Sequence, residues 1–414
     1  MNKKKIQIGT AFISMILIIS PVYANECIWV PEDLYGNSFE TYINNYMTER
    51  HITSLAFSVL NGTEVFYSKG FGVQPETDNA YHLNSAAKMI TGTAVMQLYE
   101  QGLIGLDDDF NDYLPYELKN PYYPSTKITI KHLLSYQSSI FDTFSAFENY
   151  WTSLANGTCT FPSIIYEFLH ENGTYYSEDN WENWEPGTNT EHCDIGIDIL
   201  TLIVENVTST PFDTYVTENI FIPLGMTNTR FSADDYSPEK LVIGYDWNSV
   251  SRTNEIAPYL NNSNNPGGGG YFSTVEDLSK FMLAHMNQGE YNGTSILTPT
   301  TIELMHTEIE TSKRGLGWTV RVSFGVNHDY QGHGGGPWNG FYSGNYYRST
   351  VGAVLLLNQG SNPEGGTLFE YIVVIANKLL TEKTCPETTS FYLLPIISFF
   401  AVFTILRKLR KRKV

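Results

Sequence analysis

The chain has 414 residues and carries 25 lysines and arginines against 44 aspartates and glutamates, which gives a formal net charge of −19. An acidic surface of this kind repels nucleic acid and anionic lipid, so we expect no nucleic-acid partner. The length is compatible with one large domain or with two, and it carries no signal for the oligomeric state.

The first residues have the order of a secretory signal peptide. Lys3 to Lys5 precede an apolar run over residues 6–19, and Val22-Tyr23-Ala24 then offers small residues to a signal peptidase. An uncleaved anchor helix is the alternative, but the apolar run is short for one. We therefore expect residues 1–24 to be removed as a signal peptide.

A second apolar run covers residues 391–406 and leads directly into a dense basic tail, residues 407–414. Positive charge stays on the cytosolic side of a membrane. This order predicts a transmembrane helix over residues 387–406 and a cytosolic tail, so that the chain is a single-pass type I membrane protein of the secretory pathway. A buried helix with a basic end and a removed lipid-anchor signal are the alternatives.

The part between these ends, residues 25–386, is predicted to be a lumenal or extracellular ectodomain. It contains six acceptor patterns for N-glycosylation, Asn-x-Ser/Thr, which suggest a eukaryotic secretory glycoprotein. They begin at Asn61, Asn156, Asn172, Asn206, Asn261 and Asn292.

Four cysteines occur in the chain: Cys27, Cys159, Cys193 and Cys385. An oxidising compartment permits disulfides, and four cysteines allow three pairings that sequence alone does not distinguish. Our hypothesis is that Cys27 pairs with Cys385, which would join the two ends of the chain, and that Cys159 pairs with Cys193.

Strand-like segments lie near both ends of the ectodomain. Residues 52–60 and 64–67 are joined by Asn61-Gly62, which is typical of a β-hairpin. Residues 317–323 and 351–357 are strand-like again. The pattern predicts an antiparallel sheet that is built from both chain ends.

Helical periodicity dominates the middle of the chain, over residues 86–100, 195–206 and 275–286, and returns over 369–380. Strands at both ends with helices between them indicate an α+β fold, in which helices flank the sheet and a mostly helical region is inserted.

The first chemical motif is Ser85-Ala86-Ala87-Lys88. Residues three apart share one face of a helix, so Lys88 would lie beside Ser85. Serine is a poor nucleophile without a neighbouring base, and lysine can be that base. A serine N-cap followed by a surface lysine is the structural alternative, and the four-residue motif alone does not exclude it.

The sequence around and beyond this motif resembles the serine β-lactamase and penicillin-binding-protein family, especially its class C and esterase-like branch. The resemblance covers residues 52–380. Its segments are Ser85 to Pro115 with Gly105-Leu106-Asp107 and Tyr113-Leu114-Pro115, ITIKHLLSYQSS (128–139), the Pro-Gly-Thr segment (186–208), IFIPLGMTNTRF (220–231), GGGGYFSTVEDLSKFM (267–282), GHGGGPWNGFYSG (332–344) and VGAVLLLNQG (351–360).

The resemblance implies roles for these residues. Ser85 would be the acyl-accepting nucleophile and Lys88 its base or proton relay. His333, Gly334 and Gly335 stand in the third motif. The backbone N–H groups of Gly336 and Ser85 would stabilise the developing oxyanion. A hydrogen-bonded strand histidine is the alternative for His333.

The second motif departs from the family. The pattern expects Tyr-x-Asn, whereas this chain has His192-Cys193-Asp194. His192 could still act as an acid or base, while Asp194 would favour the protonated form of Lys88. The site could therefore be active with His192 as base, active on another substrate, or inert. A further hypothesis is that Cys193 pairs with His192 and acts as a cysteine nucleophile.

Two hypotheses about function follow. The first is a serine hydrolase that forms an acyl-enzyme at Ser85 with a small-molecule or short-peptide amide or ester, without a metal ion or cofactor. The second is an inactive surface glycoprotein that acts as a binding module.

Tyr136 and Ser139 replace a histidine and a glycine of the family pattern. An aromatic insert over residues 149–184 is expected to line or cover the cleft.

Overall fold

The computed structural model describes residues 37–142, 163–257, 267–309, 311–312, 314–324, 327–338, 340–360, 368–369 and 372–373. The chain divides into two compact units, and every described residue belongs to the unit Val30–Asn377. The predicted signal peptide, transmembrane helix and basic tail lie outside the described residues, as do Cys27, Cys159 and Cys385. Within the described ranges, no helix is long and apolar enough to cross a membrane.

A six-stranded antiparallel sheet has the order β2-β1-β12-β11-β10-β9. One of its pairings joins the two ends of the chain, because β1 runs alongside β12 from Leu55↔Leu357 to Leu60↔Gly352. This confirms the predicted α+β fold with a sheet built from both ends. The strands are β1 (Ser54–Leu60), β2 (Val65–Gly72), β9 (Thr319–Phe324), β10 (Asn327–Trp338), β11 (Phe341–Arg348) and β12 (Val351–Leu357).

The local sequence accounts for where some of these strands begin and end. Gly62 takes a φ of 91° in the predicted hairpin turn, a conformation that glycine adopts without steric cost. The strand predicted from residue 317 begins only at Thr319. Gly317 has a φ of 66°, and a Cβ there would lie 2.7 Å from the Cα of Gly92, so this residue makes a close turn against α2.

The three helices predicted for the middle of the chain are present, and α9 has the predicted bounds. The helices are α1 (Asn37–Glu49), α2 (Lys88–Glu100), α3 (Ile130–Leu134), α5 (Ser163–Leu169), α6 (Asp194–Thr208), α7 (Phe212–Val216), α8 (Ile222–Leu224), α9 (Val275–Met286) and α10 (Pro299–His306). Of the helix predicted over 369–380, the described residues 369, 372 and 373 are helical.

Short elements complete the described fold. Turns of 3₁₀- or π-helix form η2 (Asn84–Ala87), η3 (Phe110–Tyr113), η4 (Glu178–Asn180), η5 (Thr217–Phe221) and η6 (Ala233–Asp235). Two-stranded ribbons pair β3 (Tyr81–His82) with β6 (Phe272–Ser273), β4 (Tyr245–Asn248) with β5 (Thr253–Ile256), and β7 (Glu290–Tyr291) with β8 (Thr294–Ser295).

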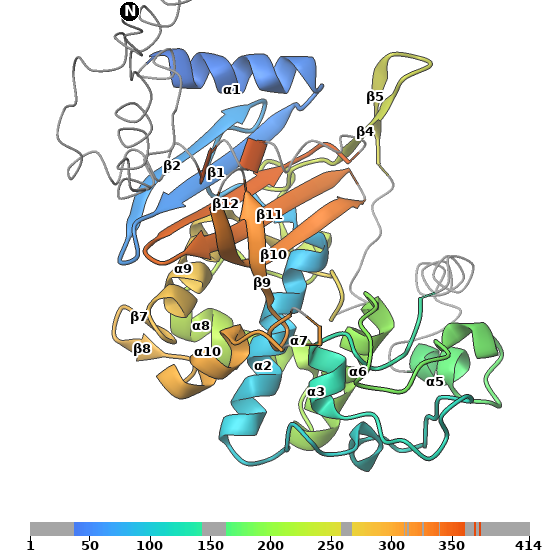
Figure 1. The fold of residues 1–414 in the computed structure, drawn as a ribbon. Helices are drawn as coiled ribbons and strands as arrows, with labels where there is room; N and C mark the ends of the chain where they lie inside the picture. Colours follow the sequence, from blue (N-terminus) through green and yellow to red (C-terminus); the bar gives the residue numbers. More distant parts are fainter. Residues whose placement is uncertain are drawn as a thin grey trace, which may run out of the picture. The chain divides into compact units, whose positions relative to one another are not determined.

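The core lies between the sheet and the central helices. Figure 1 shows α1 on one side of the sheet and α2, α9 and the other helices on the opposite side. All seven residues of β1 are buried, which agrees with cover on both faces. Ser58 on β1 and Ser279 on α9 share a hydrogen bond of 2.5 Å between their hydroxyl groups, so α9 packs directly on the sheet. Helix α2 is buried from Lys88 to Leu98 and forms the axis of the helical part.

A chain of buried polar groups crosses this core. The Tyr347 hydroxyl lies 2.9 Å from Nδ1 of His306, whose Nε2 lies 3.2 Å from Nδ1 of His285. Nε2 of His285 lies 3.1 Å from the hydroxyl of Thr93, which donates its own proton to the carbonyl of Met89. Because the Thr93 hydroxyl proton is already donated, Nε2 of His285 must donate to that oxygen, and Nδ1 of His285 must accept from Nε2 of His306. Each imidazole is therefore neutral, and all donors point from Tyr347 toward Thr93.

Candidate active site

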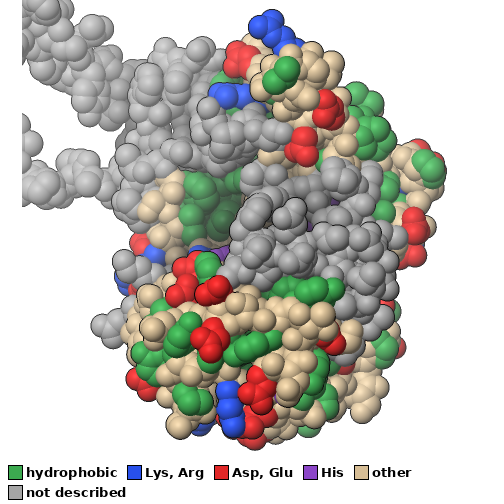
Figure 2. All heavy atoms as spheres, turned by 90° about the vertical axis from the view of Figure 1, so that its right-hand side faces the viewer, with side chains coloured by type: hydrophobic (Ala, Val, Ile, Leu, Met, Phe, Trp, Pro, Cys, Tyr) green, Lys and Arg blue, Asp and Glu red, His purple; other side chains and the backbone are tan. Residues whose placement is uncertain are grey.

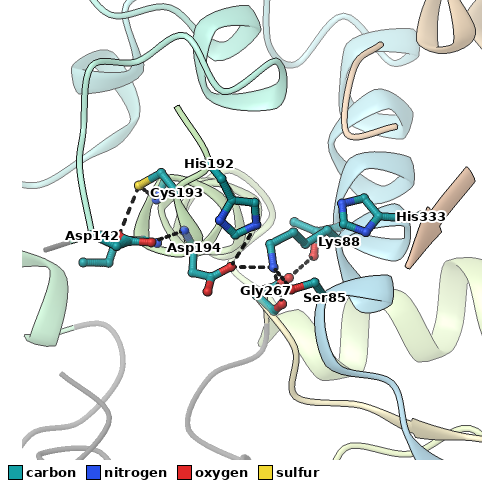
Figure 3. A network of polar contacts seen from close by, with 12 residues as sticks. Ser85, Lys88, Asp142, His192, Cys193, Asp194, Gly267 and His333 are labelled. Atoms are coloured by element: carbon teal, nitrogen blue, oxygen red, sulfur yellow. Dashed lines mark hydrogen bonds and ion pairs between the residues drawn. The ribbon is translucent and has the colours of Figure 1, made fainter. Parts of the chain in front are cut away.

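Ser85 lies on η2, directly before α2 and against β10 and β11. The preceding residue, Asn84, has a φ of 50° and turns the chain sharply between β3 and η2. Lys88 begins α2 one turn further on, and its Nζ lies 2.7 Å from Ser85 Oγ. The structure therefore brings the first two predicted site residues into hydrogen-bond contact, and Figure 3 shows them pointing toward one another.

The side chain of Lys88 is fully buried and surrounded by oxygen atoms. Besides Ser85 Oγ, its Nζ lies 2.7 Å from the carbonyl oxygen of Gly268 and 2.5 Å from Oδ1 of Asp194. A buried ammonium is stable only when it is paired and hydrogen-bonded, and these contacts meet that requirement. The carbonyl of Gly268 comes from the Gly-rich segment that the sequence had marked.

Asp194, the partner of Lys88, is the first residue of α6. Asp142, from the loop after α3, accepts hydrogen bonds from the backbone N–H groups of Asp194 and Ile195 and so caps the helix. Burial and the charge of Asp194 raise the pKa of Asp142 above its ordinary value. Burial alone would raise the pKa of Asp194, but the charges of Lys88 and His192 outweigh it and lower that pKa.

Cys193 is a free, buried thiol, so the hypothesis of a Cys159–Cys193 disulfide is wrong for this structure. Its Sγ lies 3.2 Å from Oδ1 of Asp142 and accepts a hydrogen bond from the N–H of Gly196, also at 3.2 Å. The thiol thus caps the N-terminus of α6. Burial and the nearby Asp142 raise the pKa of Cys193 well above its ordinary value, so it is not poised as a thiolate nucleophile.

His192 is 46% exposed and lies beside Asp194. Its Nε2 is 3.8 Å from Oδ1 of Asp194, and its ring stacks on Tyr136 with centroids 5.2 Å apart. Partial desolvation and the charge of Lys88 lower its pKa, against the opposing effect of Asp194. In the described part of the chain it makes no hydrogen bond to Ser85, so Lys88 is the group in place to act on the serine.

His333 lies on β10 and is buried, with both ring nitrogens engaged. Its Nδ1 is 2.7 Å from the carbonyl of Gly334, and its Nε2 is 3.4 Å from the hydroxyl of Tyr136. Burial and the positive charge of Lys88 lower its pKa to about 3, so the ring is neutral at physiological pH. The third motif therefore places a neutral imidazole, and not a cation, beside the reactive pair.

The glycines of β10 bring this strand against η2. A Cβ on Gly335 would lie 2.2 Å from the carbonyl oxygen of Leu83, so only glycine fits. The N–H of Gly335 donates to the Ser343 hydroxyl at 3.0 Å and is not available for an oxyanion. The ladder to β11 changes register between Gly335 and Trp338. Gly336 thus lies at an irregularity of the strand, and its role as an oxyanion donor stays a prediction.

Asn84 is a positioning residue that the sequence analysis missed. Its amide nitrogen donates to the carbonyl oxygens of Gly336 at 2.9 Å and Phe341 at 3.0 Å. It thereby joins the turn that carries Ser85 to β10 and β11. A polar residue directly before the reactive serine was the only sequence signal for this role, and Asp142 had none beyond its nearness to the segment 128–139.

The described part of the aromatic insert packs beside the loop that carries Tyr136 and Asp142. Trp181 is buried and forms a β-bridge with Ile140, and the N–H of Glu182 donates to the carbonyl of Ser139 at 2.8 Å. Residues 143–162 lie outside the described residues, so the prediction that the insert covers the cleft is not tested.

Three comparisons agree with this geometry. The sequence model of the Beta-lactamase family matches residues 39–377. Protein flp of Staphylococcus aureus is 26% identical over 214 residues, an alignment that covers 50% of this chain and 40% of that protein. The chain therefore spans well under two thirds of this relative's length.

Solved structures show the same fold. A penicillin-binding protein homologue from Pyrococcus abyssi superposes with a TM-score of 0.67 at 23% identity, over 83% of this chain and 76% of that one. A D-amino acid amidase from Ochrobactrum anthropi superposes with a TM-score of 0.65 at 17% identity, over 83% of this chain and 98% of that one. With the family match over most of its length, the chain belongs to the Beta-lactamase family.

Proposed function

We propose that the chain is a serine hydrolase that forms an acyl-enzyme at Ser85 with an amide or ester. The observation that carries the proposal is the distance of 2.7 Å between Ser85 Oγ and Nζ of a fully buried lysine, Lys88. A buried lysine beside a serine at the start of a helix is the arrangement that nucleophilic acyl transfer needs.

In the proposed reaction, Ser85 Oγ attacks the substrate carbonyl and loses its proton to the neutral amine of Lys88. Lys88 then gives this proton to the leaving nitrogen or oxygen, so that an amine or alcohol departs and the acyl group stays on Ser85. Water attacks the acyl-enzyme, again through Lys88, and releases a carboxylic acid and free Ser85. The backbone N–H groups of Ser85 and Gly336 would stabilise the oxyanion in both steps.

A small molecule or a short peptide is the proposed substrate. The amidase with a similar fold, together with the penicillin-binding relative, supports an amide as one substrate class. Figure 2 shows acidic side chains spread over one face of the described molecule, with lysine and arginine at only a few places. Such a face is unsuited to nucleic acid or another polyanion.

The proposed location is the secretory pathway, with an ectodomain held by one transmembrane helix over residues 387–406. The sequence patterns at both ends support this, and so does the exposure of the glycosylation acceptors Asn172, Asn206 and Asn292 in the structure. An acceptor must be exposed to be modified. Glycosidase treatment of the expressed protein would test this by a loss of mass.

An inactive binding module is the second candidate, and the Lys88–Asp194 ion pair favours it. An ammonium held by a carboxylate at 2.5 Å cannot accept the proton of Ser85. The family pattern has an asparagine at this position, which would not hold the proton in this way. The pair thus gives a physical route by which the fold could be retained without catalysis.

Intact mass of the deglycosylated protein, after exposure to a fluorophosphonate and separately to a penicillin, distinguishes the two candidates. The serine-hydrolase proposal expects a single adduct that is absent in Ser85→Ala. A folded wild-type protein without any adduct would refute the proposal and favour the binding module.

A further inference from the structure

Tyr136 occupies a strained and buried position on the loop after α3. Its φ is 59°, and its side chain is almost fully buried. A tyrosine in the left-handed region is costly and persists only where the surroundings hold it there. Here the surroundings are two of the family's motifs, because Tyr136 contacts both His192 and His333.

The hydroxyl of Tyr136 faces the unprotonated ring nitrogen of His333. Nδ1 of His333 lies 2.7 Å from the carbonyl oxygen of Gly334, which can only accept, so Nδ1 carries the imidazole proton. Nε2 is therefore a lone pair, and it faces the phenol at 3.4 Å as an acceptor. The Gly334 carbonyl thus sets this neutral tautomer, and the phenol is the donor that faces the lone pair of Nε2.

The ring of Tyr136 holds the second motif. It stacks on His192 at 5.2 Å with 25° between the ring planes, and the guanidinium of Arg314 lies 5.1 Å from its centroid. His192 in turn approaches Asp194, the partner of Lys88. One side chain thus contacts the residues that flank the Ser85–Lys88 pair on two sides.

We propose that Tyr136 supplies, from the loop after α3, the phenol that the second motif lacks at position 192, and that it acts as a positioning residue for the hydrolysis. This inference rests on the proposed function. Tyr136 links the second and third motifs by holding His192 beside Asp194 and by donating to the lone pair on Nε2 of His333. The sequence shows the corresponding exchange, since a tyrosine stands at 136 and a histidine at 192, where the family pattern has the reverse.

Tyr136→Phe is the informative variant, because it keeps the ring stack and removes only the hydroxyl. We expect kcat for an activated ester to fall roughly tenfold with little change in KM, as the loss of one ordinary hydrogen bond to a positioned group would give. Tyr347→Phe is the matched control. It removes another buried phenol–imidazole hydrogen bond, to His306 at 2.9 Å, away from the site.

Nuclear magnetic resonance of ¹⁵N-labelled histidine supplies a readout that a merely structural role would not change. The charged and titratable groups around His333 are Lys88, Arg314, His192 and Asp194, besides Tyr136 itself. Wild-type His333 should show one neutral tautomer with Nδ1 protonated. Without the phenol, Nε2 loses the donor to its lone pair, so in Tyr136→Phe it should take up a proton at a higher pH than in wild type, with a new acid limb in the rate profile, while Nδ1 stays protonated against the Gly334 carbonyl.

The outcomes separate the two proposals. A wild-type protein that labels at Ser85, with Tyr136→Phe slowed and Tyr347→Phe not, supports the role of Tyr136. Equal rates and equal His333 spectra in wild type and Tyr136→Phe would overturn this role and leave the hydrolase proposal intact. Absence of any Ser85 adduct in wild type would overturn the hydrolase proposal, and the role of Tyr136 in hydrolysis with it.

Discussion

Oδ1 of Asp194 lies 2.5 Å from Nζ of Lys88, and the same nitrogen lies 2.7 Å from Oγ of Ser85. A carboxylate at this distance in a buried site stabilises the ammonium, because loss of the proton would leave a buried charge without its partner. An ammonium has no lone pair with which to accept a proton from serine. The ion pair therefore opposes the first chemical step of the proposed reaction.

We expect Asp194→Asn to accelerate acylation of Ser85 by about tenfold, because a neutral amide no longer favours the ammonium form of Lys88. The measurement is the second-order rate constant of fluorophosphonate labelling at neutral pH, followed by intact mass. Asp142→Asn is the control, since it removes a carboxylate from the same helix end and should change stability more than rate. A slower reaction of Asp194→Asn would show instead that Asp194 takes the proton from Lys88.

Gly335→Ala should abolish labelling and destabilise the protein. The added Cβ would lie 2.2 Å from the carbonyl oxygen of Leu83, and backbone must move to relieve the clash, at a cost of about 1–3 kcal/mol. The movement would separate β10 from the turn that carries Ser85. Gly196→Ala is the matched control, since its Cβ would meet its nearest atom, Sγ of Cys193, at 3.5 Å. Thermal unfolding and labelling of both variants test this, and a normal rate in Gly335→Ala would contradict it.

Asn84→Ala and Asn84→Gly separate two contributions of one residue. Both variants lose the hydrogen bonds to Gly336 and Phe341, so both should lower the labelling rate. At a φ of 50°, alanine carries a steric cost of about 1–2 kcal/mol that glycine avoids. Asn84→Ala should therefore unfold at a lower temperature than Asn84→Gly while labelling at a similar rate. Unchanged labelling in both would remove Asn84 from the set of positioning residues.

Much of the fold was predictable because its hydrophobic periodicity is strong. The strand β12 and the helix α9 have the predicted bounds, and both are dominated by apolar residues in regular spacing. Strand β10 could not be predicted in the same way, because NHDYQGHGGGPW has no alternation of apolar and polar residues. Its conformation depends on pairing with β11 and β9, which sequence spacing does not reveal.

Local spacing predicted the candidate site only where its residues are close in the chain, whereas the contact of Asp194 with Lys88 was expected from the family resemblance. Ser85 and Lys88 lie three residues apart on one helical face, so their contact follows from local geometry. The roles of Tyr136 and Asp142 arise from a loop that tertiary packing brings against α6 and β10, and no local pattern encodes such a contact. The sequence proposed His192 as one possible acid or base, and in the structure its ring contacts Tyr136 and approaches Asp194.

The histidine chain of the core predicts a loss of stability in acid. Burial lowers the pKa of His306 to about 3 and that of His285 well below its ordinary value of 6.5. As the pH falls, the unfolded chain therefore binds protons before the folded chain does. The stability that these two histidines contribute is fully present above about pH 6.5 and is lost as the pH decreases toward 3. Each of these histidines should lower the free energy of unfolding by about 1.4 kcal/mol per pH unit within that window.

Urea unfolding at a series of pH values measures this slope, and His306→Gln is the variant that tests its origin. Glutamine can still donate to Nδ1 of His285 and accept from Tyr347, but it takes up no proton, so the slope should become shallower by one histidine's share. His285 keeps its own share of the dependence, and so do His333 and His82, whose pKa values burial lowers to about 3 and about 4. An identical slope in His306→Gln and wild type would show that His306 does not contribute to the acid sensitivity.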